Sequence, residues 1–161
     1  MTVSVYAVAD YFIRKVNREA GDDITQFKLQ KLLYYAQAWH LAMHDTPLFD
    51  STFEGWVHGP VCAEIYDRFR HLAFSPIPSQ ESRTHLEVFE EPVQKFLDEV
   101  WDIYGQYSAA KLEQMTHEED PWIEARKALR PTDPGHAIIN EATMRNFYRT
   151  RIQARRRIRE K

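Results

Sequence analysis

The sequence predicts a mainly α protein: a compact single-domain helical bundle around a buried central helix at about 26–44, with a short β-hairpin near 47–58. Three observations predict this class. The chain has 161 residues, enough for one domain with a real core. Apolar residues make up 43% and charged residues 28%, close to globular averages, which excludes disorder of the whole chain. Apolar residues also recur at helical spacing in several segments.

The first segment with helical spacing covers about 4–20, and Gly21 follows it as a natural stop. Its apolar residues recur at steps of three and one, which is typical of one helix face. They are Val5, Val8, Ala9, Phe12, Ile13 and Val16.

The next segment, 26–44, predicts the central helix. After Lys31, no Asp, Glu, Lys or Arg occurs until Asp45. A helix that is apolar nearly all round is buried on most sides, so the other helices are expected to pack against it. Either Asp23 or Thr25 is expected to cap its start.

Residues 47–58 interrupt the helices. Their apolar residues show no helical period, which favours short extended segments or a small hairpin. Gly59 ends this stretch, and Pro60 suits the first position of a helix, where its missing N–H would be unpaired anyway. Apolar steps of four, four and three then predict a helix at about 60–73. Its stripe is Val61, Ile65, Phe69 and Leu72.

Further helices follow a polar loop. Steps of three and one predict a helix at about 90–106. Ser108 is expected to cap a short helix. Asp120 is expected to cap another, with Pro121 in its first turn.

The C-terminal segment carries a charge opposite to that of the body. Asn140 is expected to cap a basic helix at 141–161. Residues 145–161 hold eight basic residues and one acidic, a net charge of +7, and the other 144 residues hold 13 basic and 23 acidic, a net charge of −10. A basic segment attracts nucleic acid or an acidic protein surface, whereas an acidic body repels nucleic acid. Three interpretations stay open: a solvated helix end, a dock for an acidic protein, and a nucleic-acid contact.

The cysteine count and the hydropathy indicate the compartment. A single cysteine, Cys62, excludes a disulfide framework and a thiolate metal cage within one chain, and it fits a reducing environment. No apolar run approaches the roughly 20 residues of a membrane span, and the N-terminus lacks the pattern of a signal peptide. We therefore expect a cytoplasmic protein without membrane contact.

The candidate catalytic and metal-binding groups favour structural roles. His40 and His44 have a spacing that can bind a metal, but two imidazoles alone make an incomplete site. The string at 117–120, His-Glu-Glu-Asp, is interpreted as a helix junction whose glutamates face water. Cys62 stands near a helix start that could activate it, yet packing is the favoured role. No P-loop, dinucleotide or nucleophile-elbow motif occurs, so we expect no enzyme, no cofactor and no metal.

The most unusual string is Trp-Val-His-Gly-Pro at 56–60. A helix that begins at Pro60 would direct free N–H groups at an anion or at a partner carboxylate. The favoured interpretation is a rigid turn with a core tryptophan, and an interaction site is the alternative.

Three strings together resemble the Panacea domain family, which includes a SocA-like proteolytic adaptor and phage-associated GepA-like proteins. They follow one another between residues 28 and 126: KLQKLLYYAQAWHLA at 28–42, PLFDSTFEGWVHGPVCAEIYDRF at 47–69 and LEQMTHEEDPWIEAR at 112–126. The resemblance implies a single, mainly helical antitoxin domain over 1–161, of bacterial or prophage origin.

The resemblance also implies a function. Members neutralise a cognate protein toxin by direct binding, and the toxins include translation-blocking enzymes similar to small alarmone synthetases. We expect this chain to bind its toxin in the same way and to block the toxin's active site. No catalytic residue or cofactor is implied. Two alternatives stay open: an adaptor that delivers the toxin to a protease, and a nucleic-acid-binding regulator that acts through the basic tail. The acidic body makes nucleic acid the less favoured partner.

Two sets of residues are candidates for partner binding. The first set comprises family-motif positions: Trp56, His58, Gly59, Pro60, Tyr66, His117, Pro121 and Trp122. The second set lies in the basic tail and is expected to raise the association rate of an acidic partner more than its affinity. It comprises Arg149, Arg151, Arg155, Arg156, Arg157 and Arg159.

Overall fold

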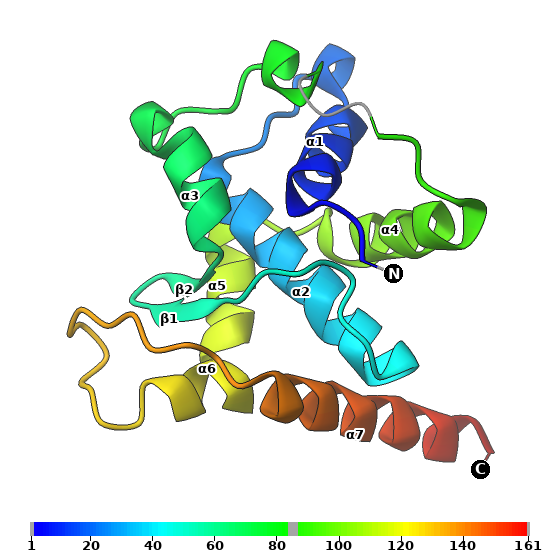
Figure 1. Ribbon diagram of the computed structural model, residues 1–161, viewed down its shortest axis with the longest axis vertical. Coiled ribbons are helices and arrows are strands. Elements are labelled where there is room, and N and C mark those ends of the chain that lie inside the picture. Colours follow the sequence, from blue (N-terminus) through cyan, green and yellow to red (C-terminus); the bar gives the residue numbers. More distant parts are fainter. Residues whose placement is uncertain (1, 84–86, 161) are drawn as a thin grey trace.

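The computed structural model describes residues 2–83 and 87–160, with side chains up to residue 153. It confirms a mainly α fold with a small antiparallel hairpin (Figure 1). The helices are α1 (Val5–Lys15), α2 (Gln26–His44), α3 (Ala63–Phe69), α4 (Glu91–Tyr104), α5 (Ala109–His117), α6 (Asp120–Ala125) and α7 (Glu141–Glu160). The strands are β1 (Glu54–Trp56) and β2 (Gly59–Val61), and short 3₁₀ turns are η1 (Arg18–Ala20), η2 (Arg70–Leu72) and η3 (Ser79–Arg83).

Helix α2 has the predicted bounds and lies at the centre of the fold. Figure 1 shows it crossing the middle of the molecule, and α1, α3, α4, α5 and α7 all pack against it. Thr25 caps its start, since its hydroxyl accepts a 3.3 Å hydrogen bond from the backbone N–H of Lys28. Asp45, at φ +64°, ends the helix. The stretch without charged residues after Lys31 thus lies in the core, which confirms the buried central helix that its pattern predicted.

The hairpin and α3 begin later than predicted. Gly59 pairs with Trp56 and Pro60 with Gly55, so Pro60 is a strand residue and the prediction of a helix from Pro60 is wrong. Proline is tolerated here because β2 pairs with β1 on one side only, so that its other side is a sheet edge. Cys62 is the N-cap of α3, and its N–H donates to Oε1 of Gln30 on α2, 2.8 Å away. This long-range bond keeps the chain extended up to Cys62.

Helix α1 is shorter than the predicted 4–20. Val16 adopts an extended conformation after Lys15, and residues 18–20 form the separate turn η1. The side chain of Asn17 caps that turn by accepting a 3.2 Å hydrogen bond from the N–H of Ala20. An asparagine that competes for backbone groups in this way ends a helix despite a continuing apolar stripe.

Helix α7 packs along α2 and extends the core. Asn140 caps it, as predicted, by accepting from the N–H of Thr143 at 3.0 Å. Tyr148 is fully buried, and its ring meets that of Tyr34 edge to face, with centroids 6.2 Å apart. None of the described helices combines the length and the apolar character that a bilayer crossing requires.

Candidate functional site

The β1–β2 turn rests directly on a lysine of α2. Gly59 has φ +108°, and a Cβ at this position would lie 2.5 Å from Cε of Lys31. Glycine is needed here both for the left-handed conformation and for the close approach. Pro60 follows in β2 and is buried. Gly59 and Pro60 therefore shape the turn and are covered themselves.

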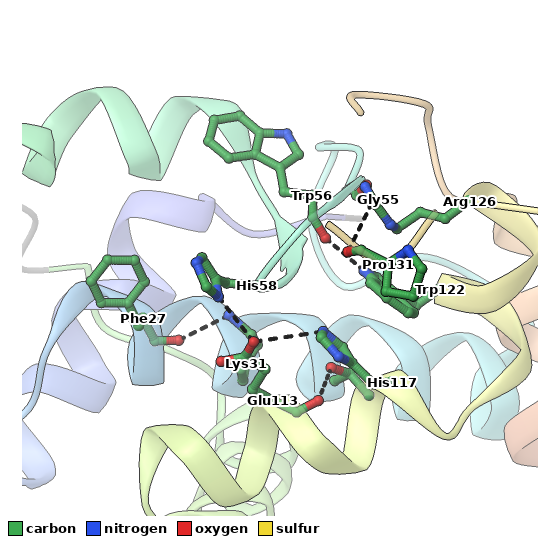
Figure 2. Close-up of polar contacts among 11 residues, drawn as sticks. Phe27, Lys31, Gly55, Trp56, His58, Glu113, His117, Trp122, Arg126 and Pro131 are labelled. Carbon is green, nitrogen blue, oxygen red and sulfur yellow. Dashed lines mark hydrogen bonds and ion pairs between the residues drawn. The ribbon is translucent and has the colours of Figure 1, made fainter. Parts of the chain in front are cut away.

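Lys31 places a buried amine beneath this turn (Figure 2). The residue is 2% exposed, and Nζ donates to the carbonyl oxygen of Phe27 over 3.3 Å. Burial lowers the pKa of Lys31 to about 8, and the carboxylate of Glu113 acts in the opposite direction. The centre of the site thus holds an amine whose charge is poorly solvated.

Glu113, on α5, joins two histidines beside Lys31. Its Oε1 lies 3.0 Å from Nδ1 of His58 and 3.8 Å from Nε2 of His117 (Figure 2). The side chain of His58 is 67% exposed, which makes it accessible to a partner, whereas that of His117 is only 30% exposed. Burial lowers the pKa of His117; Glu113 partly opposes this, and the charge of Lys31 reinforces it.

Trp122 and Arg126 tie the start of α6 to the hairpin. The rings of His117 and Trp122 stack with centroids 3.9 Å apart. Nε1 of Trp122 donates to the carbonyl oxygen of Trp56 over 2.8 Å. Arg126 lies over the Trp122 ring and donates to the carbonyl oxygen of Gly55 over 2.9 Å. The sequence strings at 47–69 and 112–126 therefore form one structural unit.

The outward side chains of this unit are aromatic. Trp56 is partly exposed and meets Tyr66 edge to face, with ring centroids 4.8 Å apart. Trp56, His58 and Tyr66 are called the hairpin patch below. Pro121 and Trp122, in contrast, are buried. The motif residues thus divide into four side chains that are at least partly exposed, these three and His117, and a buried scaffold that holds them.

The other candidate chemical groups have structural partners. Nδ1 of His40 lies 2.6 Å from the carbonyl oxygen of Thr46, and the rings of His40 and His44 both pack against Phe96. Among the described residues, no three His, Cys, Asp or Glu side chains are grouped to hold a metal ion. Cys62 is buried, and burial raises the pKa of its thiol to about 12. This keeps the thiol protonated and favours a packing role.

Glu119 is a buried acid that sequence reasoning missed. The residue is 5% exposed, and Oε1 accepts hydrogen bonds from the hydroxyls of Tyr35 (2.7 Å) and Tyr148 (2.9 Å). Nη1 of Arg151 lies 3.8 Å from its Oε2. Burial raises the pKa of Glu119, and the two tyrosine hydrogen bonds oppose this. The prediction that Glu119 faces water is wrong, and so is the N-cap role of Asp120, because Glu119 holds that position and turns inward.

The first arginines of α7 pair within the chain. Arg145 and Arg149 lie 3.3 and 3.2 Å from Oδ1 of Asp45, and Nε of Arg149 donates to the carbonyl oxygen of Ala42 over 3.2 Å. The remaining docking candidates lie outside the residues whose side chains are described: Arg155, Arg156, Arg157 and Arg159.

Comparison with known families identifies the domain. The family model for the antitoxin SocA-like Panacea domain matches residues 29–123, more than half of the chain. The chain therefore belongs to the SocA-like antitoxin family of Panacea domains, as its three sequence strings predicted. No curated protein and no solved structure matched it. The matched residues run from the first turn of α2 into α6 and include the whole hairpin, whereas α1 and α7 lie outside them.

Proposed function

We propose that this protein is an antitoxin that binds a cognate protein toxin directly and blocks access to the toxin's active site. The observation that carries the proposal is the family match over 29–123, which contains both Lys31 and the hairpin patch. On the family resemblance, the toxin is a translation-blocking enzyme of the alarmone-synthetase type. The domain itself supplies binding and no catalysis.

The hairpin patch is the first contact surface that we propose. Tryptophan and tyrosine are enriched among the residues that dominate binding energy at interfaces. The patch is also held rigidly, because Trp122 bonds the Trp56 carbonyl over 2.8 Å and Gly59 seats the turn on Lys31. A rigid surface loses little conformational entropy on binding, which favours affinity.

Purification from the native host tests the proposal. The tagged chain should co-elute with one stoichiometric protein that arrests growth when expressed alone and is harmless when co-expressed with this chain. Sequestration predicts a long-lived, inactive toxin in the complex. A shortened toxin half-life, with a protease subunit in the eluate, would instead identify an adaptor. The absence of any toxic partner would refute the antitoxin proposal.

Variants of the hairpin patch test the first contact. Replacing Trp56 and His58 together by Ala should weaken toxin binding roughly tenfold or more, since these side chains are accessible and a central aromatic carries much of the energy. His71→Ala, at another exposed histidine, is the matched control. Equal affinity of the double variant and the control would exclude the patch.

The basic tail is expected to act on the association rate. Replacing Arg155, Arg156 and Arg157 by Glu should slow association and reduce its salt dependence, because charge steers the encounter more than it stabilises the complex. Stopped-flow mixing at low and high salt measures both quantities. An unchanged association rate would remove the tail from the mechanism.

A further inference from the structure

A groove of about 500 Å³ runs beside the C-terminal half of α2, away from the hairpin patch. Three helices line it. Helix α2 supplies Trp39, Ala42, Met43 and His44, α4 supplies Phe96, Glu99, Val100, Ile103 and Tyr104, and α7 supplies Arg149, Ile152 and Gln153. Most of this lining is apolar, and Met43 and Ile103 remain 52% and 46% exposed. Exposed apolar side chains that gather in one groove favour a surface that another protein covers.

The spacing of the lining residues predicts the shape of the occupant. On α4 the lining positions are 96, 99, 100, 103 and 104, one face over about two turns or ~12 Å of helix. On α2 and α7 the main lining positions recur at steps of three and one. A trough walled by such rows on three helices accepts the apolar face of an amphipathic helix, with anchors at i, i+3 and i+4.

The charge of the α7 wall predicts the polar flank of that helix. Within the described side chains, Arg145 and Arg149 share a single acidic partner, Asp45. Two guanidinium groups thus face one carboxylate, and the described part of the α7 wall carries a net positive charge. An acidic flank on the occupant would complement it.

We propose that the groove between α4 and α7 binds an amphipathic helix of the toxin, with its apolar face on Met43 and Ile103 and an acidic flank toward α7. This inference rests on the proposed antitoxin function and names a second contact surface. The groove is distinct from the hairpin patch, since Lys31 and Met43 are twelve residues apart on α2, or ~18 Å along its axis. One of its walls, α7, lies outside the matched family residues, so the groove suits recognition of this chain's own toxin.

The test compares two exposed apolar positions changed to the same acid. Ile103→Glu places a charge in the groove, and Val88→Glu, at a residue that is 93% exposed outside it, is the matched control. The probe is the purified toxic partner captured by the wild-type chain, with affinity measured by titration calorimetry. Ile103→Glu should weaken binding roughly tenfold or more, and Val88→Glu less than about twofold. Thermal unfolding followed by circular dichroism checks that both variants fold.

A photo-crosslinking amino acid at Met43 identifies the occupant directly. In host cells it should crosslink to a segment of the partner with helical apolar periodicity and a net negative charge, as mass spectrometry of the crosslinked peptide will show. Crosslinks only to a second copy of this chain, or wild-type affinity of a folded Ile103→Glu variant, would overturn the groove proposal while the antitoxin function stands. Crosslinks only to an acidic helix of a non-toxic protein would also overturn the proposal, because the toxin would not be the occupant, and the co-purification described above tests the antitoxin function separately.

Discussion

The buried amine of Lys31 predicts a specific dependence of stability on pH. Burial lowers the pKa of Lys31 in the folded protein to about 8, against about 10.4 in the unfolded chain. Between these values the folded state has released the proton and the unfolded state has kept it. The unfolded state then binds more protons, so the contribution of Lys31 to the free energy of unfolding rises with pH. From about pH 7.5 to about pH 9.5 this gain is about 2 kcal/mol.

The comparison variant is Lys31→Met, which keeps an unbranched side chain and removes the amine. The contribution of Cys62 to the free energy of unfolding falls with pH in this range, because burial raises the pKa of its thiol to about 12 and the unfolded thiol releases its proton first. Its contribution is common to both proteins and cancels in their difference. The buried tyrosines have raised pKa values and lower stability only above about pH 10, outside the window.

Urea unfolding, followed by tryptophan fluorescence at several pH values, measures the effect. The free energy of unfolding of the wild type should gain about 2 kcal/mol over Lys31→Met between about pH 7.5 and about pH 9.5. The exposed residue Lys127 provides the matched control, Lys127→Met. Parallel pH profiles of the wild type and Lys31→Met would refute the reasoning, because they would mean that Glu113 holds the amine protonated throughout the window.

Three further predictions concern the scaffold. In urea titrations, Glu119→Ala should lower the free energy of unfolding by about 3 kcal/mol, since two buried tyrosine hydroxyls lose their acceptor. Glu118→Ala, at the exposed neighbour, should change it by less than about 0.5 kcal/mol. Equal values for the two variants would contradict the hydrogen bonds from Tyr35 and Tyr148 to Glu119. Gly59→Ala should lower the free energy of unfolding by about 3 kcal/mol, because the new Cβ would meet Lys31 in addition to the positive φ. Gly21→Ala has positive φ but open space around it, and should lower the free energy of unfolding by about 1 kcal/mol. Similar losses in the two variants would mean that Lys31 does not fill the space under the turn. A thiol reagent at about pH 8 should react with Cys62 at least roughly a hundredfold slower in the native protein than in urea, and a fast native reaction would contradict its burial.

The sequence predicts α2 with its observed bounds because local information suffices there. A long stretch without charged residues identifies a helix buried on most sides, and Thr25 supplies a cap within three residues of the N–H that it binds. Ser108 and Asn140 cap their helices in the same local way. The family strings at 47–69 and 112–126 contain the hairpin and the start of α6, so the sequence also indicates these two segments as family motifs.

The remaining features depend on partners far away in the sequence. Pro60 lies in a strand because Gln30 accepts a hydrogen bond from the N–H of Cys62, which holds the chain extended. Segment 137–139 also forms backbone hydrogen bonds with Phe53 and Gly55, at the start of β1. Glu119 is buried because Tyr35 and Tyr148 approach it from α2 and α7. No local pattern contains such contacts. The acidic string around Glu119 has the composition of an exposed junction, and only the tertiary structure shows which acid turns inward.

The packing of Tyr148 against α2 has a consequence for synthesis of the chain. Tyr34 and Tyr148 are separated by 114 positions, and their hydroxyls lie 3.2 Å apart in the core. A nascent chain that has emerged only as far as α6 therefore exposes an aromatic face of α2 to solvent and to chaperones. Helix α7 must emerge from the ribosome before this face is covered. Newly made molecules thus pass through a vulnerable stage in which proteases compete with folding, and translation speed through α7 becomes a determinant of how much folded protein accumulates.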